Sequence, residues 1–319
     1  MENYYLFANG ELKRKDNNIS IITEDKGTKD LKIEVMNDIY LFGEISTNTK
    51  CINYLGQMKV PVHFFNYYGF YTGSFYPKET NVSGNLLIKQ VEYYTDNEKR
   101  SEIAKEFIES AAFNIYRNLR YYNGRGKDLE NMMGQIKGLQ KELSKAESVN
   151  EIMGVEGNIR KVYYSAWKEI INQEIDFEKR VKRPPDNMIN TLISFVNSLI
   201  YTTCLSEIYK TQLNPTISYL CLDVAEIFKP LIGDRLIFSL LNKNMITEKD
   251  FEKGSNFYYL KENGRKKILK EYDERLKQTI KHKDLGREVS YSYLIRLECY
   301  KLIKHILGDK KYEGFKMWW

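Results

Sequence analysis

Cysteines, histidines and long apolar runs are scarce in this chain of 319 residues, which has four cysteines and three histidines. The cysteines have no paired spacing, which argues against a thiolate zinc site and fits a reducing compartment. No stretch approaches the roughly 18 uninterrupted apolar residues of a membrane helix, and the N-terminal MENYYLFANG lacks the basic and apolar regions of a signal peptide. We therefore expect no membrane insertion, no secretion and a cytoplasmic location.

Motifs of three large enzyme classes are also missing. The sequence has no G-x-S-x-G, no P-loop and no dinucleotide-binding fingerprint. Serine hydrolases, nucleotide hydrolases and dehydrogenases built on these motifs need them to position a nucleophile or a phosphate group. The sequence therefore disfavours these three functions.

Positive charge gathers near the C-terminus. The net charge of the chain is +6, whereas residues 261–316 alone hold 16 Lys or Arg against 9 Asp or Glu. Such a surplus suits a polyanion partner. On charge alone, a solvated basic helix face explains it equally well.

The pattern of apolar residues changes once along the chain. Over residues 1–77, short runs rich in β-branched and aromatic residues predict strands, and Asn9-Gly10 is a turn signal typical of a hairpin. After a polar linker at residues 78–85, the pattern becomes helical and stays so to the end. We therefore predict an α+β fold with two domains: a small β-rich N-terminal domain over residues 1–77 and a larger all-α C-terminal domain over residues 86–319.

One acid interrupts an apolar helical stripe. In NEIMGVEGNIRKVYYSAW, Glu156 follows Ile152 by four residues and so lies on the predicted buried face. A buried carboxylate must be protonated, paired with a base or bound to a cation, because burying an unpaired charge is costly. Gly157, which weakens a helix by about 1 kcal/mol relative to Ala, suggests a close approach to the backbone here. A salt bridge from Glu156 to Arg160 or Lys161 is the simpler alternative.

Two further acids stand one helical turn apart in PTISYLCLDVAEIFKP. Asp223 and Glu226 flank an apolar face at i, i+3 spacing, so both can point to one place. Together with Glu156 they form a carboxylate set that suits Mg²⁺ or Mn²⁺, which prefer oxygen ligands and take substrate phosphate oxygens into their shell. A metal so held would polarise a phosphodiester and orient an attacking hydroxyl or water.

Several longer segments carry a resemblance to a known family. They are VPVHFFNYYGFYTGSF, GVEGNIRKVYY, RPPDNMINTLISFVNSLIY, SEIYKTQLNPTISYL, LCLDVAEIFKPLIGDRLIF, REVSYSYLIRLECYKLIKHILG and the terminal MWW. In this combination and order they resemble the Cas1 family of CRISPR adaptation systems, the integrases of spacer acquisition. The resemblance covers almost the whole chain and is nearest to the branch associated with type I systems.

The resemblance implies a metal-dependent DNA endonuclease and integrase, in which the 3′ hydroxyls of a protospacer attack phosphodiesters at a CRISPR repeat. It implies a homodimer formed through the β-rich domains, which assembles with the small Cas2 protein around DNA. It further implies that Glu156 and Glu226 hold the metal, Mg²⁺ or Mn²⁺, with Asp223 as a neighbouring acid that tunes or assists the site.

One element of the family pattern is missing. In relatives, a metal-binding histidine in a short loop follows the ISYL-like segment, whereas here Leu220 runs straight into Cys221 and about ten residues are absent. A true deletion would leave a carboxylate-only site, and the protein could then be a non-catalytic DNA-binding assembly factor. The alternative, which we prefer, is that the sequence in hand omits a mobile loop.

Seven residues are expected to contact DNA. Four belong to the basic C-terminal segment, where tyrosines are interleaved, and three flank the Pro184-Pro185 turn, where they resemble family positions that orient the phosphate. The set is Arg180, Arg183, Asn190, Lys281, Lys283, Arg287 and Arg296.

Overall fold

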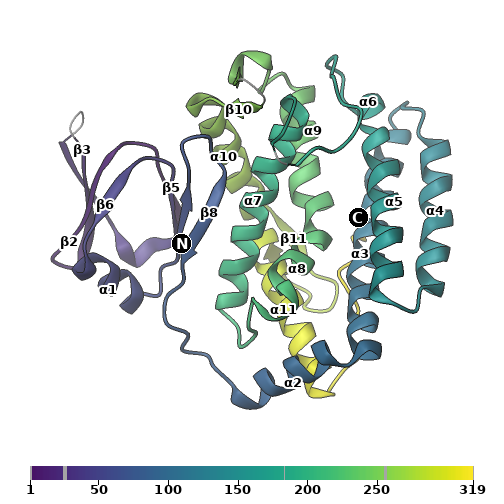
Figure 1. Ribbon diagram of the computed structural model, residues 1–319, viewed down its shortest axis with the longest axis horizontal. Coiled ribbons are helices and arrows are strands. Elements are labelled where there is room, and N and C mark those ends of the chain that lie inside the picture. The colour runs from purple at the N-terminus through teal and green to yellow at the C-terminus, as the bar shows by residue number, and fades with distance from the viewer. Residues whose placement is uncertain (1, 24–26, 183, 255–256, 319) are drawn as a thin grey trace. The chain divides into compact units, whose positions relative to one another are not determined.

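The structure is a computed structural model that describes residues 2–23, 27–182, 184–254 and 257–318. It divides into two compact units, Met1–Thr80 and Asn81–Trp319, and the division falls within the stretch expected to be a linker. The first unit contains the longer strands and the second contains most of the helices (Figure 1). The predicted α+β class, with strands first and helices after them, is confirmed.

The first unit is built of strands and one α-helix. Its elements are β1 (Glu2–Leu6), β2 (Gly10–Lys15), β3 (Asn18–Thr23), β4 (Gly27–Leu31), β5 (Met36–Leu41), β6 (Ile45–Thr47), α1 (Thr49–Gln57), β7 (Val62–Phe65) and β8 (Tyr71–Phe75). They form two four-stranded sheets, of order β1-β5-β7-β8 and β4-β3-β2-β6. Apolar side chains from both sheets, among them Leu12, Ile19 and Ile39, share one core with Leu55 of α1. Burial of these side chains holds the unit together.

The Asn9-Gly10 pair does not form the predicted hairpin. Strand β1 instead runs parallel to β5 in one sheet, while β2 pairs with β3 in the other. Glycine is needed at position 10 because of a close approach, since a Cβ there would lie 2.1 Å from the carbonyl oxygen of Ile22. The turn between β2 and β3 lies at Asp16, whose φ of 52° is left-handed. The Asn-Gly signal thus marks a crossing between two sheets.

The second unit is mainly helical. Its helices are α2 (Gly84–Thr95), α3 (Asn97–Asn123), α4 (Glu130–Lys145), α5 (Val149–Ser165), α6 (Trp167–Ile170), α7 (Met188–Tyr209), α8 (Leu220–Phe228), α9 (Arg235–Asn242), α10 (Glu262–Lys277) and α11 (Tyr291–Leu307). A π-helical turn, Lys229–Asp234, joins α8 to α9, and short 3-10 turns lie at Ile217–Tyr219 and Glu248–Asp250. Helices α3, α4 and α5 lie side by side, and α3 also packs on α8 (Figure 1).

Helix α7 is a long, largely apolar helix in the core of the helical unit. Residues around its whole circumference are buried, including Ile189, Leu192, Val196 and Ile200. By length and composition alone this helix could cross a membrane, yet 72% of its apolar window is buried inside the protein. A helix that is apolar all round is what the centre of a helical domain requires. Packing within the domain therefore accounts for its sequence.

The C-terminal part of the chain is not helical throughout, contrary to the prediction. Two short hairpins interrupt the helices: β9 (Phe251–Lys253) with β10 (Tyr258–Leu260), and β11 (Thr279–Lys281) with β12 (Glu288–Ser290). Strands of three residues are too short to show a period of two, so the helical period of their neighbours conceals them.

Candidate active site

Helix α5 places Glu156 at the edge of its buried face. The helix begins after Ser148, a favourable capping residue, and its side chains Ile152 and Ile159 are buried. Glu156 is half-buried between them, as the pattern predicts. Gly157 is exposed, and a Cβ on it would meet no described atom within 4 Å. The expected close approach is therefore not made by the described protein atoms, and the backbone there is open to a ligand.

Helix α8 carries Asp223 and Glu226 one turn apart. The chain enters this helix through a 3-10 turn in which Ser218 has a φ of 60°, a conformation uncommon for residues other than glycine. Leu220 and Cys221 are consecutive residues of the helix, so the described chain has no loop between them. The apolar residues of α8 are largely buried, which leaves the two acids on its remaining side.

Glu226 is held by two cations. Arg160 of α5 and Lys229 of the π-helical turn form ion pairs with different oxygens of its carboxylate. The three side chains are largely buried, with exposed fractions of 14% for Arg160, 17% for Lys229 and 18% for Glu226. Burial raises the pKa of Glu226, but Lys229 and Arg160 outweigh burial and lower this pKa to about 2. Arg160 is therefore the partner of Glu226, and the described residues contain no salt bridge between Glu156 and Arg160 or Lys161.

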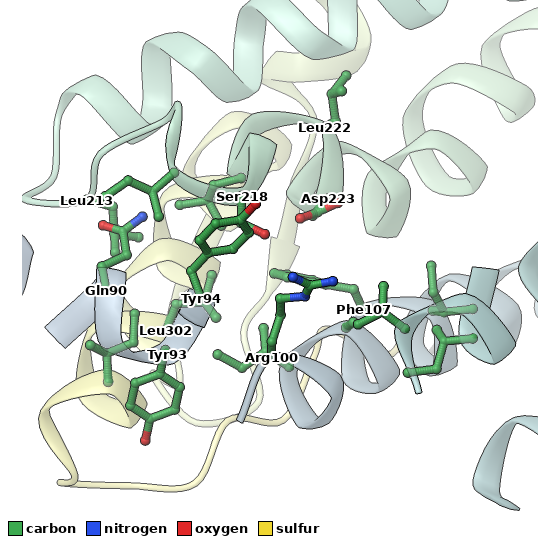
Figure 2. Close-up of a pocket in the computed structure, with 18 of the residues that line it drawn as sticks. Gln90, Tyr93, Tyr94, Arg100, Phe107, Leu213, Ser218, Leu222, Asp223 and Leu302 are labelled. Carbon is green, nitrogen blue, oxygen red and sulfur yellow. The ribbon is translucent and has the colours of Figure 1, made fainter. Parts of the chain in front are cut away.

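Glu156 and Asp223 line one cavity of about 390 Å³ in the helical unit. Its walls come from α2, α3, α5, α8 and α11 and are mostly apolar. Figure 2 shows Asp223 and the guanidinium of Arg100 turned into the cavity, beside Tyr94. The guanidinium of Arg100 lies 5.3 Å from the ring centre of Tyr94. Apolar walls strengthen the electrostatic effect of these few charged groups on a ligand.

The three carboxylates act on one another's protonation. Burial, together with the negative charges of Glu226 and Glu156, raises the pKa of Asp223 to about 7. Burial and the charge of Glu226 also raise the pKa of Glu156. Like charges disfavour ionisation when they are near one another, so these shifts reflect the gathering of the acids. A bound cation would relieve this repulsion.

The residues present fit a hard divalent cation only in part. Among the described residues, no group of three Asp, Glu, His or Cys side chains is arranged to hold a metal ion. Each oxygen of the Glu226 carboxylate already contacts a cation, Arg160 or Lys229. Glu156 and Asp223 supply the oxygen donors that Mg²⁺ or Mn²⁺ prefers and face the same cavity. The structure thus pairs Glu156 with Asp223 in the cavity, where the family resemblance pairs it with Glu226.

Arg180 and Asn190 form a network with each other. Arg180 donates to the side-chain oxygen of Asn190 at 3.1 Å and to the hydroxyl of Ser194 at 2.8 Å. Asn190 has no exposed surface and donates to the carboxylate of Asp186 at 2.7 Å. This network fastens the segment before α7 to the first turns of that helix, so a direct contact of the Asn190 side chain with DNA does not fit the arrangement. Arg183 lies outside the described residues.

The predicted basic surface is divided by the structure. Lys281, Lys283 and Arg287 are exposed and lie together on the β11–β12 hairpin, not on a helix as expected. Arg296 of α11 donates through Nε to the buried carboxylate of Glu207 at 2.7 Å. Part of the Arg296 charge is therefore neutralised within the protein, and the hairpin carries the accessible charge.

Two charged side chains of the candidate site were not predicted from the sequence. Lys229 follows Glu226 by three residues, and this spacing on one helical face could have revealed the pair. Arg100 belongs to α3, far from the acids in sequence, and only the fold brings it to the cavity of Asp223. No sequence spacing could have indicated that contact.

Comparison with known proteins places this chain in a family. The family model described as CRISPR associated protein Cas1 matches residues 4–274. A CRISPR-associated endonuclease Cas1 of Fusobacterium nucleatum is 63% identical over 326 positions, covering 99% of this chain and 96% of that protein. The solved structure of a Cas1 protein from Thermotoga maritima is 40% identical, with a TM-score of 0.88, and covers 99% of this chain and 100% of that one. The chain belongs to the Cas1 family.

A more distant structure shares the fold alone. A casposase bound to integration product is 22% identical to this chain, with a TM-score of 0.85, and the match covers 99% of this chain and 93% of that one. The alignment with the F. nucleatum protein is itself informative, because at least seven of its 326 positions have no residue from this 319-residue chain. This chain is therefore shorter than that alignment by at least seven residues.

Proposed function

We propose that this chain is a metal-dependent DNA endonuclease and integrase that inserts protospacer DNA into a CRISPR array. Membership of the Cas1 family supports the class, and the relative from F. nucleatum is named an endonuclease. The observation that carries the proposal is the meeting of Glu156 and Asp223, from two separate helices, in one cavity beside Glu226. Mostly apolar walls around paired acids are typical of a catalytic centre.

Each charged residue has a proposed part. Glu156 and Asp223 would hold Mg²⁺ or Mn²⁺, with Glu226 as the adjacent acid, and the ion would supply positive charge that polarises a phosphodiester. Arg160 and Lys229 fix the carboxylate of Glu226 from two sides and keep it ionised. The carboxylate of Glu226 is therefore negatively charged at neutral pH.

The proposed reaction is a displacement at phosphorus. The oxygen of a 3′ hydroxyl forms a new bond to phosphorus, its proton passes to solvent, and the bond from phosphorus to the 3′ oxygen of the target strand breaks. That 3′ oxygen leaves and takes up a proton. Water in place of the hydroxyl gives simple cleavage. Arg100, a guanidinium in the cavity wall, is suited to bind a phosphate oxygen that carries charge throughout.

DNA, a second copy of the chain and Cas2 are the proposed partners. The exposed cations Lys281, Lys283 and Arg287 support a DNA contact at the β11–β12 hairpin. The proposal that residues 1–77 form a homodimer interface, and that Cas2 joins the assembly, rests on family membership.

A non-catalytic DNA-binding assembly factor is the alternative function. The full engagement of Glu226 by Arg160 and Lys229 is the observation in its favour. We do not favour it, because two carboxylates still face the cavity and the similar F. nucleatum protein is named an endonuclease.

The two functions are separated by one assay on branched DNA. The purified protein is incubated with labelled branched DNA in Mn²⁺ or in EDTA, with strands that end in a 3′ hydroxyl or a 3′ dideoxy nucleotide. We expect cleavage in Mn²⁺ only, and joined products only from strands with a 3′ hydroxyl. Binding of the DNA without cleavage or joining in Mn²⁺ would instead establish the assembly factor.

A further inference from the structure

The C-terminal segment, residues 312–317, has no regular secondary structure and is nevertheless largely buried. The exposed fractions of Tyr312, Phe315 and Met317 are 1%, 6% and 1%. A segment outside helices and sheets has no regular backbone partners, so its buried N–H and C=O groups need partners from elsewhere in the protein. The side chains that supply these partners show what the segment is attached to.

An asparagine and a glutamate supply the partners. Asn114 of α3, which has no exposed surface, donates through Nδ2 to the carbonyl oxygen of Phe315 at 3.0 Å. Its Oδ1 accepts from the N–H of Met317 at 2.9 Å. The carboxylate of Glu298 in α11 accepts from the N–H of Phe315 at 3.0 Å and from the hydroxyl of Tyr312 at 2.6 Å. The segment is therefore attached to α3 and α11 through its backbone.

Close packing fixes the segment against α3 as well. A Cβ on Gly314 would lie 2.1 Å from Oγ of Ser110, so this position admits no larger residue without a shift of the chain. The N–H of Gly314 donates to the carboxylate of Glu106 at 3.2 Å. The segment thus has one defined position along α3.

The same asparagine holds the end of α8. Nδ2 of Asn114 also donates to the carbonyl oxygen of Ile227 at 3.2 Å, and Ile227 directly follows Glu226. Helix α8 loses its regular hydrogen bonds at this point, because Pro230 has no N–H to donate to the carbonyl oxygen of Glu226. Asn114 therefore supports the backbone of α8 where the helix cannot support itself.

Two further contacts brace the same end of α8. The ring of Phe315 stacks on that of Phe228, the last residue of α8, with ring centres 5.9 Å apart and an angle of 19° between the planes. Asn118, one turn after Asn114 on α3, donates to the carbonyl oxygen of Pro230 at 2.7 Å. The end of α8 is thus held by α3 and by the C-terminal segment together.

We infer that Asn114 and residues 312–317 position α8 for the proposed reaction. They hold the C-terminal end of the helix and thereby the carboxylates of Asp223 and Glu226. The inference rests on the proposed function, which assigns these carboxylates to the active site. Groups that carry out a reaction must be held to within about 0.5 Å by the residues around them, and packing and hydrogen bonds provide that support.

The role is one of positioning. Asn114 and Phe315 are not among the described residues that line the cavity, and both act through α8. A displacement of α8 moves its two acids relative to Glu156, which belongs to α5. Loss of either contact should therefore slow the chemical step without weakening the binding of DNA.

The first test is amide hydrogen exchange followed by mass spectrometry, in the absence of DNA and metal. In Asn114→Ala we expect the amides of α8 to exchange about tenfold faster, the size of effect expected for loss of a buried hydrogen bond, while those of α4 are unchanged. An unchanged rate in α8 contradicts the inference. An equal rise in α4 and α8 also contradicts it, because it would show a general loss of stability.

The matched control is Asn242→Ala. Asn242 donates to the carbonyl oxygen of Ile170 at 3.1 Å and accepts from the N–H of Asn172 at 2.8 Å. It thus forms the same kinds of hydrogen bond between other parts of the helical unit, and its loss should leave exchange in α8 unchanged. Phe315→Leu, which removes the stacked ring and keeps an apolar side chain, should accelerate exchange in α8 as Asn114→Ala does. Should Asn114→Ala fail to fold, Phe315→Leu decides.

The second test is cleavage of labelled branched DNA in Mn²⁺ at several DNA concentrations. For Asn114→Ala and Phe315→Leu we expect the maximal rate to fall by at least about tenfold, since a misplacement of about 1 Å can cost about a hundredfold. The DNA concentration that gives half the maximal rate should not change. Maximal rates equal to that of the unaltered protein contradict the inference. The proposed function fails separately, when the unaltered protein does not cut DNA, and hydrogen exchange then still decides whether these residues hold α8.

Discussion

Arg160 lies between two buried acids. It pairs with Glu226, and it lowers the pKa of Asp234, which burial raises to about 7. Removing one partner of a buried ion pair leaves an uncompensated charge and typically costs about 3–5 kcal/mol. We therefore expect Arg160→Met to lower the free energy of unfolding by about that amount, as measured by urea denaturation at pH 7.

The matched control for this prediction is Lys15→Met. Lys15 forms an exposed ion pair with Asp30 at 3.3 Å, and exposed pairs contribute little because water and salt screen them. Its unfolding should be indistinguishable from that of the unaltered protein. If Arg160→Met were equally harmless, Arg160 would not be compensating buried charge.

We expect the free energy of unfolding to fall in mild acid because of His63. It is fully buried on β7, its ring nitrogen Nδ1 lies 2.6 Å from the hydroxyl of Ser74, and burial lowers its pKa from 6.5 to about 3. The unfolded chain binds a proton below pH 6.5 while the folded chain does not, so stability present above that pH is lost as the pH falls. Between pH 7 and pH 5 we expect a loss of about 2 kcal/mol from this residue.

The variant His63→Gln isolates the effect of His63 from that of other titrating groups. Acids with raised pKa, such as Asp223 and Asp234, bind protons in the folded state and shift stability in the opposite direction. The difference between the unaltered protein and the variant should therefore shrink by about 2 kcal/mol from pH 7 to pH 5 in urea denaturation. A constant difference would show that His63 does not resist protonation in the folded protein.

The sequence pattern predicted where the three acids lie more accurately than it predicted what each acid does. The position of Glu156 on an apolar stripe and the i, i+3 spacing of Asp223 and Glu226 indicated the carboxylates that the fold brings together. The pattern could not show that Arg160 pairs with Glu226, because the two residues belong to different elements and are 66 positions apart in sequence. Nor could it show that Asn190 is fully buried, since an Asn at a helix start is more often exposed.

Two glycines in helical elements predict opposite responses to alanine. A Cβ on Gly233 would lie 2.7 Å from a methyl group of Ile200 in α7, so Gly233→Ala overpacks that contact and should cost about 1–3 kcal/mol. A Cβ on Gly157 of α5 meets nothing within 4 Å, so Gly157→Ala should stabilise by up to about 1 kcal/mol through helix propensity. Thermal unfolding of both variants checks the pair. A destabilised Gly157→Ala would mean that α5 does require a glycine there.

Secondary-structure prediction succeeded for long elements and failed for short ones. The long helices α3, α4, α5 and α7 all lie in the region predicted to be helical, residues 86–319, because 16 to 27 residues repeat the apolar spacing several times. The strands of the two C-terminal hairpins have three residues each, too few to repeat an apolar-polar alternation, so the sequence pattern did not predict them. The Asn-Gly signal at position 10 was misread, since a glycine required by a close approach resembles one required by a turn.

At the scale of the whole molecule, the length of the chain is a testable quantity. The 319 residues correspond to 37.8 kDa. A protein that carries a further loop between Leu220 and Cys221 would be heavier by about 1 kDa, for a loop of ordinary length near ten residues. Intact-mass spectrometry of the protein purified from its natural source distinguishes the two. A mass of 37.8 kDa is the result expected of a carboxylate-only site, and a heavier protein would restore a loop beside the cavity.

The overall class was predictable because independent features agreed. The ordered motifs resembled one family, and the match over residues 4–274 confirms it. The change from strand to helical pattern predicted the α+β class, which the fold confirms. What sequence could not supply is the arrangement of charges. The cavity and the ion pair between Arg160 and Glu226 depend on contacts between helices, which spacing within one helix does not reveal.

The central claim is that the carboxylates facing the cavity carry out metal-dependent DNA cleavage. The most direct test is the rate at which labelled branched DNA is cut in Mn²⁺ by the unaltered protein, by Glu156→Gln, and by the control Glu142→Gln, which changes an exposed acid of α4. We predict that Glu156→Gln lowers the cleavage rate by at least about a hundredfold, the size expected for loss of one charged group of a catalytic site. The affinity of Glu156→Gln for DNA and the cleavage rate of Glu142→Gln should both equal those of the unaltered protein. Equal cleavage by Glu156→Gln and the unaltered protein would contradict the account.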